Sequence, residues 1–506
     1  MKSVVAPSLP REKKKILVIG GGTGLTTAYM LENMSDFDVT LVEKSSRLGG
    51  HINSFDFGDH GIAEGGAEFI GSPESYPNFH KLCRRLRVSL EKFELNADFH
   101  KVSIQNGGDN ILLPPVYNRT AKADETVGCF SRLFGSRNKK QSKTVLAFNS
   151  LMTHLSDFIA LQWTILHAQH RSAPQTIEEV ETLEQFVEKF KQYPACIGMN
   201  IDKFADRVLY PLVAASWGIV MSEAKQMCAH YALNYISLSK DWYDAPAGLS
   251  SYMAAMEARC GKLHIKKETE IVKLIRVGEG LKYQALLSDN TLLMGDDGKS
   301  AVFDDVVIST PAYATVSMLP DIDPQEMANL KVALHAVRYY PTTVVLHTDT
   351  TYETPNETVI HTRVEGDYAS NTAQKDWKAK NGATAVMKTW VQPGQVMPAQ
   401  DKILQVCHYQ HPYMDKAYFI AQQALYDMQE KYNLNFGGIM AGLGDSHEDA
   451  TIAALKVAKA ICAKYKCLDR NKRLGAFLDE NGNVLERNSQ LSSHEEERAA
   501  PSLAMS

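Results

Sequence analysis

Residues 15–24 read K-I-L-V-I-G-G-G-T-G, and this stretch decides the fold. The apolar run Lys15–Ile19 ends in glycines, which predicts a buried parallel strand followed by a tight turn. Thr26–Asn33 then has the pattern of a helix, and Asp38–Val42 (DVTLV) predicts a second strand. Strand, turn, helix and strand within about 30 residues form a βαβ unit. The sequence therefore predicts an α/β fold with a parallel sheet.

The glycine turn is suited to a phosphate group. Backbone N–H groups at a helix N-terminus attract a phosphate, which can approach closely only where no Cβ intrudes. Glu43 ends the second strand, where its carboxylate can accept hydrogen bonds from ribose hydroxyls. The glycines Gly20, Gly22 and Gly24 are one residue short of the usual G-x-G-x-x-G spacing. We therefore expect a dinucleotide site with a reshaped loop, or a helix that starts one residue early.

Two further segments resemble the flavin amine oxidase and desaturase superfamily. The run E-K-S-S-R-L-G-G-H from Glu43 to His51 resembles the sequence that follows the second strand there and contacts the pyrophosphate. The run A-E-G-G-A-E-F-I-G from Ala63 to Gly71 resembles the segment under the isoalloxazine ring. The resemblance implies a Rossmann-like FAD-binding domain of the glutathione-reductase type and an α+β substrate-binding domain.

Later segments resemble those that complete such a site. They are LHIKKETEIVKLI at Leu263–Ile275, VVISTP at Val306–Pro311, IMAG at Ile439–Gly442 and HED at His447–Asp449. The resemblance implies that a backbone amide near Asp449 stabilises negative charge on the reduced flavin. The FAD-binding positions carried over are Gly20, Gly22, Thr23, Gly24, Glu43, Lys44, Arg47, Gly49, Gly50, Gly65, Gly66, Ala67, Glu68, Ile271, Thr310, Pro311, Gly442, Glu448 and Asp449.

A narrower resemblance covers residues 15–465. It is to bacterial NAD/FAD-binding oxidoreductases associated with cyclopropane fatty acid synthases, and it implies lipid-linked redox chemistry. The motifs that carry it, besides those above, are YPNF at Tyr76–Phe79, LYPLVAASW at Leu209–Trp217, YYPTTVVLHTD at Tyr339–Asp349 and HYQHP at His408–Pro412.

The length of 506 residues predicts two domains. We expect a discontinuous FAD-binding domain from residues 13–75, 255–320 and 432–467. The substrate-binding domain would comprise residues 76–254 and 321–431. Residues 1–12 and 468–506 are polar and predict disordered tails.

Composition excludes several other classes of protein. The formal net charge of −5 gives no basic field for nucleic acid. No stretch approaches the roughly 20 apolar residues of a membrane-spanning helix, and no signal peptide is visible. The eight cysteines are scattered without zinc spacing, which predicts a reduced, cytoplasmic protein with no metal. No cysteine lies in a recognisable flavin-attachment motif, so we expect FAD to be bound non-covalently. Peripheral membrane contact and oligomeric state stay open.

Flavin supplies the hydride chemistry, so the resemblance implies no fixed catalytic triad. Candidate catalytic side chains are Trp217, His347 and His408, with Asp349 and His411 as further polar groups. A histidine can act as an acid or base near neutral pH, although a strand histidine can equally be structural.

Three functions fit these patterns. One is an FAD-dependent oxidoreductase that moves hydride from an amine to flavin N5, whose cavity should end in an aromatic cage or an anion. Another is an acyl-lipid desaturase or saturase, which should have a long apolar tunnel. The apolar face of residues 146–167 fits either a packed helix or a surface that contacts lipid. The third is a non-catalytic FAD-binding interaction protein.

Overall fold

The computed structural model describes residues 13–466, with gaps at 35–36, 94, 96, 102–108, 112–155, 158, 169, 238–240, 279, 354–358 and 443, and also residues 477 and 484. The long loop predicted at residues 118–143 lies outside these residues, as do the tail 1–12 and most of 468–506. Phe477 and Val484 are buried in the same core cluster as Leu455 of the last helix. The disorder of residues 1–12 and 468–506 stays a prediction.

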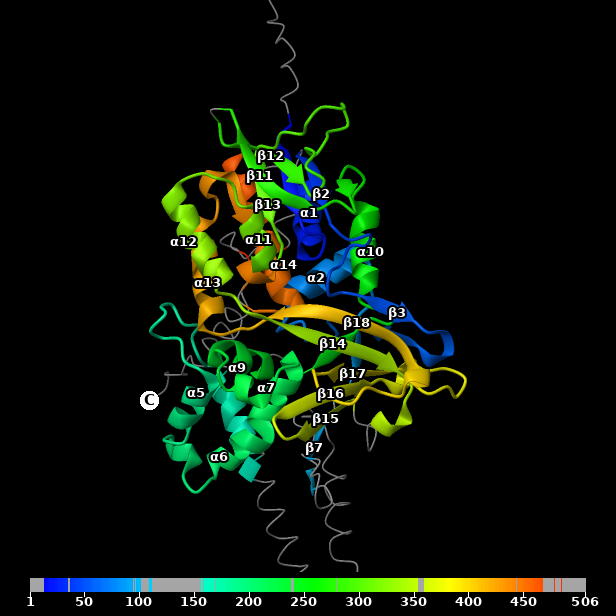
Figure 1. Ribbon diagram of the computed structural model, residues 1–506. Helices are drawn as coiled ribbons and strands as arrows, with labels where there is room; N and C mark the ends of the chain where they lie inside the picture. Colours follow the sequence, from blue (N-terminus) through cyan, green and yellow to red (C-terminus); the bar gives the residue numbers. More distant parts are fainter. Residues whose placement is uncertain are drawn as a thin grey trace, which may run out of the picture.

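A five-stranded parallel sheet forms the upper half of the molecule in Figure 1. Its strands, in spatial order, are β10 (His264–Lys266), β2 (Asp38–Val42), β1 (Lys15–Ile19), β13 (Asp305–Ile308) and β19 (Leu434–Phe436). The predicted bounds of β1 and β2 are confirmed. Each of the three segments expected to build the FAD-binding domain contributes strands to this sheet, although the domain division itself stays a prediction.

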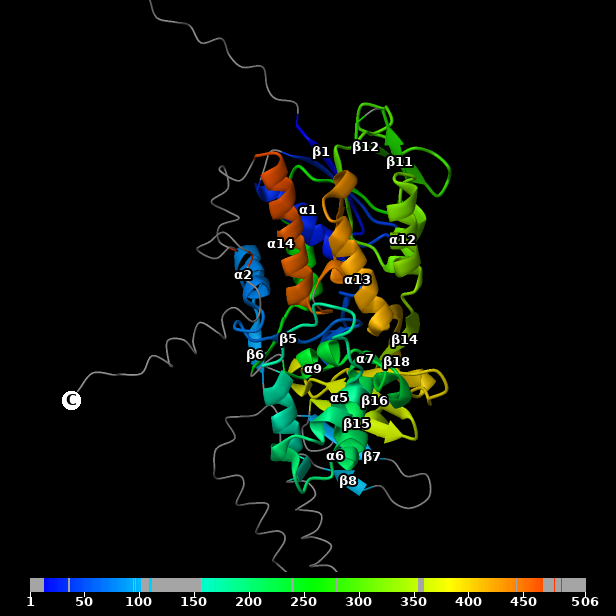
Figure 2. The same cartoon turned by 90° about the vertical axis from the view of Figure 1, so that its left-hand side faces the viewer.

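Helix α1 (Thr23–Met34) packs on β1 and β2 of this sheet, α10 (Ser250–Arg259) and α14 (His447–Lys464) pack on α1, and α2 (Pro77–Leu86) packs on α10 and α14. Figure 2 shows α14 alongside α1, with α13 (Lys416–Met428) close by. The helix predicted from Thr26 begins at Thr23, and the one predicted from about Asp449 begins at His447. A hairpin of β11 (Ile271–Val277) and β12 (Lys282–Leu287) precedes β13, and α11 (Ala312–Met318) and α12 (Pro324–His335) follow it.

A seven-stranded sheet lies in the lower half. Its strands, in spatial order, are β18 (Ile403–Pro412), β14 (Tyr339–His347), β17 (Met387–Val391), β16 (Tyr368–Gln374), β15 (Ile360–Glu365), β7 (Ala97–Lys101) and β8 (Asp109–Ile111). All neighbours are antiparallel except β15 and β7. The smaller strands are β3 (Ser54–Asp56), β4 (Ile62–Glu64), β5 (Ile70–Gly71), β6 (Glu91–Phe93) and β9 (Trp242–Asp244).

Helices cover one side of the larger sheet, and α7 packs on β16 and β15. They are α5 (Leu183–Phe190), α6 (Ile201–Phe204), a π-helical turn at Ala205–Leu209, α7 (Tyr210–Trp217), α8 (Met221–Ala224) and α9 (Ala229–Ser237). Residues 156–157 and 159–168 are helical, which confirms the described part of the helix expected at 146–167. No helix among the described residues is long and apolar enough to cross a membrane.

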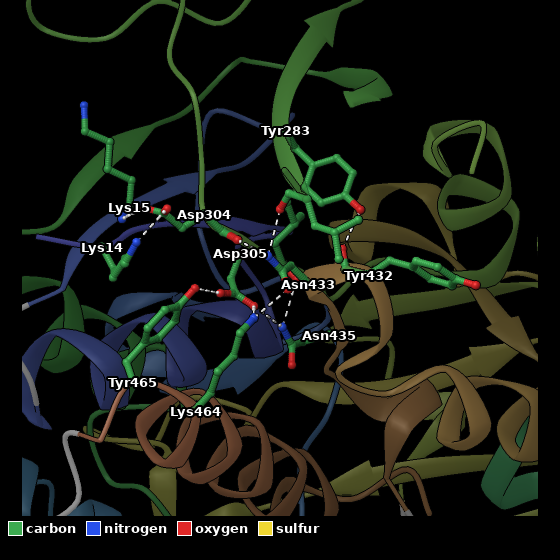
Figure 3. A network of polar contacts seen from close by, with 12 residues as sticks. Lys14, Lys15, Tyr283, Asp304, Asp305, Tyr432, Asn433, Asn435, Lys464 and Tyr465 are labelled. Carbon is green, nitrogen blue, oxygen red and sulfur yellow. Dashed lines mark hydrogen bonds and ion pairs between the residues drawn. The ribbon is translucent and has the colours of Figure 1, made fainter. Parts of the chain in front are cut away.

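A polar network ties distant parts of the parallel sheet together (Figure 3). The Asp305 carboxylate, almost fully buried, accepts hydrogen bonds from Lys464 Nζ at 2.7 Å and from the Tyr465 hydroxyl. Lys464 also donates to Asn433 Oδ1 at 2.8 Å. On the other side, Asp304 accepts from Lys15 N–H at 3.0 Å. These residues come from β1, the start of β13 and the residue before it, the C-terminal end of α14 and the turn before β19, so the network joins these segments.

We predict that Lys464→Met lowers the free energy of unfolding by about 1–3 kcal/mol, since it leaves the buried Asp305 carboxylate short of its cation. Urea unfolding followed by circular dichroism measures this change. Lys402→Met, which removes a half-exposed lysine with a 3.6 Å partner, serves as the control and should change stability little. Equal midpoints for Lys464→Met and the wild type would contradict the assigned role.

Candidate functional site

The first glycine turn packs directly on the end of β13. Gly20 has a φ of +99°, and a Cβ there would come within 2.6 Å of the Ser309 carbonyl oxygen. Gly24 lies in the first turn of α1, where a Cβ would meet Val18 Cγ1 at 3.1 Å. The glycine spacing is one residue short because α1 starts early, at Thr23, which was one of the two expectations. Gly24 serves helix–strand packing, the role that the third glycine has in such turns.

Two glycine loops face each other, and no side chain fills the gap between them. A Cβ on Gly22 would be 3.7 Å from the Gly50 Cα, and one on Gly50 would be 3.6 Å from the Gly22 Cα. The loops are joined by a hydrogen bond from Gly49 N–H to Gly21 O at 3.0 Å. Bare backbone on both sides, with the N-terminus of α1 at Thr23, fits the pyrophosphate of a dinucleotide. We call this gap the glycine cradle.

Arg47 is an exposed residue beside the glycine cradle, with its Nη1 atom 3.4 Å from where a Gly49 Cβ would be. It donates to the carbonyl oxygens of Gly50 at 2.6 Å and Ile52 at 3.0 Å, so it shapes the loop as well as supplying positive charge.

Glu43 stands at the end of β2 where a ribose is expected. Its carboxylate accepts hydrogen bonds from Gly21 N–H at 2.6 Å and Ser45 N–H at 2.8 Å. Thr269 N–H donates to the Glu43 carbonyl oxygen at 3.0 Å, which brings the start of β11, and with it the buried Ile271, close to Glu43. Lys44 next to it is exposed.

Thr310 and Pro311 lie where β13 leaves the parallel sheet. A Cβ on Gly20 would be 3.2 Å from Thr310 Cγ2, so Thr310 touches the first glycine turn. Pro311 is the N-cap of α11. The structure thus brings together the residues predicted for the nucleotide half of the site.

The side chains of Glu448 and Asp449 have structural partners. Glu448 is fully buried and accepts hydrogen bonds from Asn78 N–H at 3.1 Å, Asn78 Nδ2 at 2.6 Å and Phe79 N–H at 2.8 Å, at the start of α2. Asp449 forms a capping box with Ser446, whose Oγ accepts the Asp449 N–H at 3.2 Å. The backbone amide that the sequence suggested is therefore part of the cap of α14. The Gly442 carbonyl accepts from Gln422 at 2.7 Å.

The segment Gly65–Glu68 lies against the loop that ends at His51. A Cβ on Gly66 would come within 1.9 Å of the His51 carbonyl oxygen, which also accepts the Ala67 N–H at 3.0 Å. Gly65 N–H donates to Asn53 O at 2.7 Å. The two segments that resemble flavin contacts are therefore packed backbone to backbone.

Glu68 belongs to a buried cluster of charges. Its oxygens pair with Lys375 at 2.9 Å and Lys388 at 2.8 Å, and Asp244 pairs with Lys375 at 3.0 Å and Lys378 at 2.6 Å. Burial alone would raise the pKa of Glu68, but Lys375 and Lys388 outweigh it and lower the pKa to about 2. Glu68 is thus a permanent buried anion at neutral pH.

One face of β18 points at Gly65 and His51. Cys407 Sγ lies 2.8 Å from where a Gly65 Cβ would be, the Tyr409 ring centroid is 4.7 Å from that of His51, and the His411 ring stacks on His51 at 5.3 Å. His408 points away, is exposed, and contacts Thr343 Oγ1 at 3.2 Å. Since side chains alternate along a strand, His411 belongs to the site and His408 does not.

Both site histidines are neutral at physiological pH. Burial and the nearby Arg47 lower the pKa of His51 to about 4, and burial and His51 lower the pKa of His411 to about 3. The Nδ1 atom of His411 is buried and has no hydrogen-bond partner among the described residues. A buried polar atom of this kind is available to a ligand.

His347 and Asp349 are structural. His347 is fully buried, and its ring contacts Thr389 Oγ1 at 2.9 Å and accepts the Asp349 N–H at 3.2 Å, so both nitrogens are engaged. The Asp349 carboxylate accepts the Ala399 N–H at 2.8 Å and the Thr351 N–H at 3.0 Å.

Trp217 is buried at the end of α7, and its carbonyl accepts the Tyr340 hydroxyl at 2.5 Å. The Tyr340 ring in turn lies 5.8 Å from His411. Sequence reasoning missed His51, Tyr340, Tyr409 and Lys388 as site residues. All but Lys388 lie within the quoted motifs, so the motifs could have indicated them.

Comparison with known proteins gives the family. The model of the flavin-containing amine oxidoreductases matches residues 23–386. The chain belongs to this family. It is an FAD-dependent oxidoreductase, and FAD is the cofactor that the glycine cradle, Glu43 and the bare Gly65–Gly66 backbone fit.

Individual relatives are more distant. An L-amino-acid oxidase of Mus musculus is 36% identical over 112 residues, which span 20% of this chain and 17% of that protein. Two solved structures share the fold at 14% identity and cover 90% of this chain and all of their own. They are a CLA-producing fatty acid isomerase from P. acnes, with a TM-score of 0.58, and cyclohexylamine oxidase from Brevibacterium oxydans IH-35A, with a TM-score of 0.56.

We predict that Gly22→Ala leaves this amine oxidoreductase folded but weakens FAD binding at least about tenfold, or about 1.4 kcal/mol. The added Cβ meets no protein atom closer than 3.7 Å, so it fills only the glycine cradle. Titration of the apoprotein with FAD, followed by flavin fluorescence, gives the affinity. Gly261→Ala, whose Cβ meets nothing within 4 Å, is the control. Unchanged affinity for Gly22→Ala would show that the phosphates lie elsewhere.

The buried charge of Glu68 gives a prediction for acid stability. Its pKa is about 2 in the folded protein and near 4.5 in the unfolded chain, so its stabilising contribution is complete above pH 4.5 and is lost as pH falls towards 2. We expect Glu68→Gln to remove about 2–3 kcal/mol of this pH-dependent stability. Urea unfolding at a series of pH values measures it. If the free energy of unfolding falls equally with decreasing pH in the variant and the wild type, the prediction is refuted.

Proposed function

We propose that the protein oxidises a C–H bond of an amine or a lipid-like small molecule held against β18 and β14. FAD, when bound, supplies the hydride acceptor at its N5. The proposed holding residues are the predicted set, with Gly22, Gly49 and Gly50 at the pyrophosphate, Glu43 at the ribose and Gly65–Glu68 beside the ring. We also propose that the parallel-sheet part is a Rossmann-like domain of the glutathione-reductase type, with the larger sheet as the substrate-binding domain.

The unpartnered Nδ1 of His411 is the observation that favours an amine as the substrate. It is a buried hydrogen-bonding atom on the face of β18 that meets the cofactor-facing segments, and its ring is neutral above about pH 3. A neutral imidazole can accept an N–H from an uncharged amine and hold that amine in one orientation. The aromatic rings of Tyr340 and Tyr409 flank the same place, as an aromatic-walled amine site requires.

A lipid-like substrate is the second candidate, and a groove supports it. Trp163, Leu166, Phe190, Tyr193 and Pro194 form an apolar groove of about 370 Å³ with His167 and His170 at its edge. The groove includes the helix for which the sequence suggested lipid contact, and peripheral membrane binding would present an acyl chain to it. The fatty acid isomerase with the same fold, and the resemblance to proteins associated with cyclopropane fatty acid synthases, point the same way.

A non-catalytic FAD-binding role is the third candidate. The shortened glycine turn was the feature that favoured it. Because the early start of α1 leaves the glycine cradle intact, the turn gives no reason for weak FAD binding.

Substrate-dependent release of hydrogen peroxide, measured with a panel of amines and a panel of acyl lipids, tests the proposal. We expect turnover with an amine, and a KM raised about tenfold or more by His411→Phe, because the lost hydrogen bond contributes about 1–1.5 kcal/mol. His408→Phe, on the opposite face of the same strand, is the matched control. Oxidation of acyl lipids alone favours the second candidate. A flavin that dithionite reduces but no substrate does would favour the non-catalytic role.

A further inference from the structure

Lys388 is a lysine in an unusual place. It is the second residue of β17, and its side chain is only 2% exposed. Its Nζ donates to the Gly66 carbonyl oxygen at 2.5 Å and pairs with Glu68 at 2.8 Å. The Nζ also lies 4.4 Å from the centre of the Trp390 ring. The lysine thus reaches from the larger sheet to the backbone segment beside which we place the flavin ring.

The charges around Lys388 come from several elements. Lys375 and Lys378 follow β16, Asp244 ends β9, His60 lies between β3 and β4, and Glu64 ends β4. Glu64 accepts from Ser54 Oγ at 2.7 Å and from Leu249 N–H at 2.8 Å, and burial raises its pKa. Three amines face the carboxylates of Glu68 and Asp244, and Lys388 is the one that contacts Gly66. Burial lowers the pKa of Lys388, while the neighbouring Glu68 carboxylate opposes that effect and favours the charged amine.

A small cavity adjoins this cluster. Its volume of about 10 Å³ is close to what one water molecule needs, and its polar lining includes Glu68, Lys375, Lys378 and Lys388. The cavity gives the Lys388 side chain polar surroundings and leaves room for a slightly larger head group.

Stability alone gives a weak reason for such an arrangement. Replacing a buried ion pair by apolar residues of similar size is often neutral or stabilising, because desolvation offsets the attraction. Buried charges that contact a ligand site are more often retained for what they do to the ligand. The contact of Lys388 with Gly66 places this buried charge at the proposed cofactor site.

We propose that Lys388 is a positioning residue of the FAD site. It fixes the bare backbone of Gly65–Glu68 through the Gly66 carbonyl, and it holds a buried positive charge behind that backbone. Such a charge stabilises the negative charge that the flavin ring gains on reduction, so it raises the reduction potential. This inference rests on the proposed placement of the ring beside Gly65–Glu68.

The test is the midpoint potential and the affinity of bound FAD in Lys388→Met. We expect FAD to bind about tenfold more weakly, and the potential to become more negative by an amount equal to a tenfold change in the two-electron equilibrium, about 30 mV. Lys388→Arg keeps the charge, and the neighbouring cavity gives its guanidinium room, so the potential should stay close to that of the wild type.

Two further variants separate this role from a merely structural one. Glu68→Gln removes the anion beside Lys388, so at a pH low enough to keep Lys388 protonated the potential should move in the opposite direction, to more positive values. Lys378→Met removes a charge from the same cluster without touching Gly66 or Glu68, and should leave FAD affinity within about twofold.

The outcomes distinguish the inference from the function on which it rests. A wild-type protein that does not bind FAD would overturn the proposed function. A wild type that binds FAD, together with a folded Lys388→Met of the same affinity and potential, overturns this inference alone. If Lys388→Met does not fold, the potential of Glu68→Gln decides, and a shift to more negative values rejects the proposal.

Discussion

The site depends on close backbone contacts at glycines, where any side chain would collide with a neighbouring segment. A Cβ on Gly20 would lie 2.6 Å from the Ser309 carbonyl oxygen, one on Gly66 would lie 1.9 Å from that of His51, and one on Gly438 would lie 2.6 Å from Thr23 Oγ1. These contacts join the first glycine turn, the ends of β13 and β19, the loop before His51 and the segment after β4. Because segments hundreds of residues apart meet closely at these glycines, they expose peptide groups there, which suits a flat ring and a pyrophosphate.

Much of this half of the molecule could be predicted from the sequence, because its determinants are local. The strand β1, the glycine turn and Glu43 lie within 30 residues of one another and each has a distinct pattern. The sequence left open whether the glycine loop is reshaped or α1 starts early. The start of α1 at Thr23 and the packing of Gly24 on Val18 decide for the early start. The sequence could not decide between the histidines for a similar reason. His408 and His411 both lie in β18, and composition does not indicate which face of that strand meets Gly65 and His51.

The charged residues show where sequence reasoning ends. Glu448 resembled a cofactor ligand, but its carboxylate holds the start of α2, some 370 residues earlier in the chain. Glu68 lay in a recognised motif, whereas its partners Lys375 and Lys388 come from strands and turns with no motif of their own. Ion pairs between residues so far apart in the chain leave no periodic pattern in the sequence, since they depend on how two sheets are placed together. They matter because a buried charge acts strongly at short range in a low-dielectric interior.

The most direct test of the assembled FAD site is amide hydrogen exchange of the apoprotein with and without FAD. Binding at one composite site should slow exchange together in peptides covering residues 20–24, 49–51 and 65–68 and in the peptide at 444–449, although these stretches are far apart in sequence. Slower exchange around residues 20–24 alone, or no change on adding FAD, would contradict a site closed by both ends of the chain.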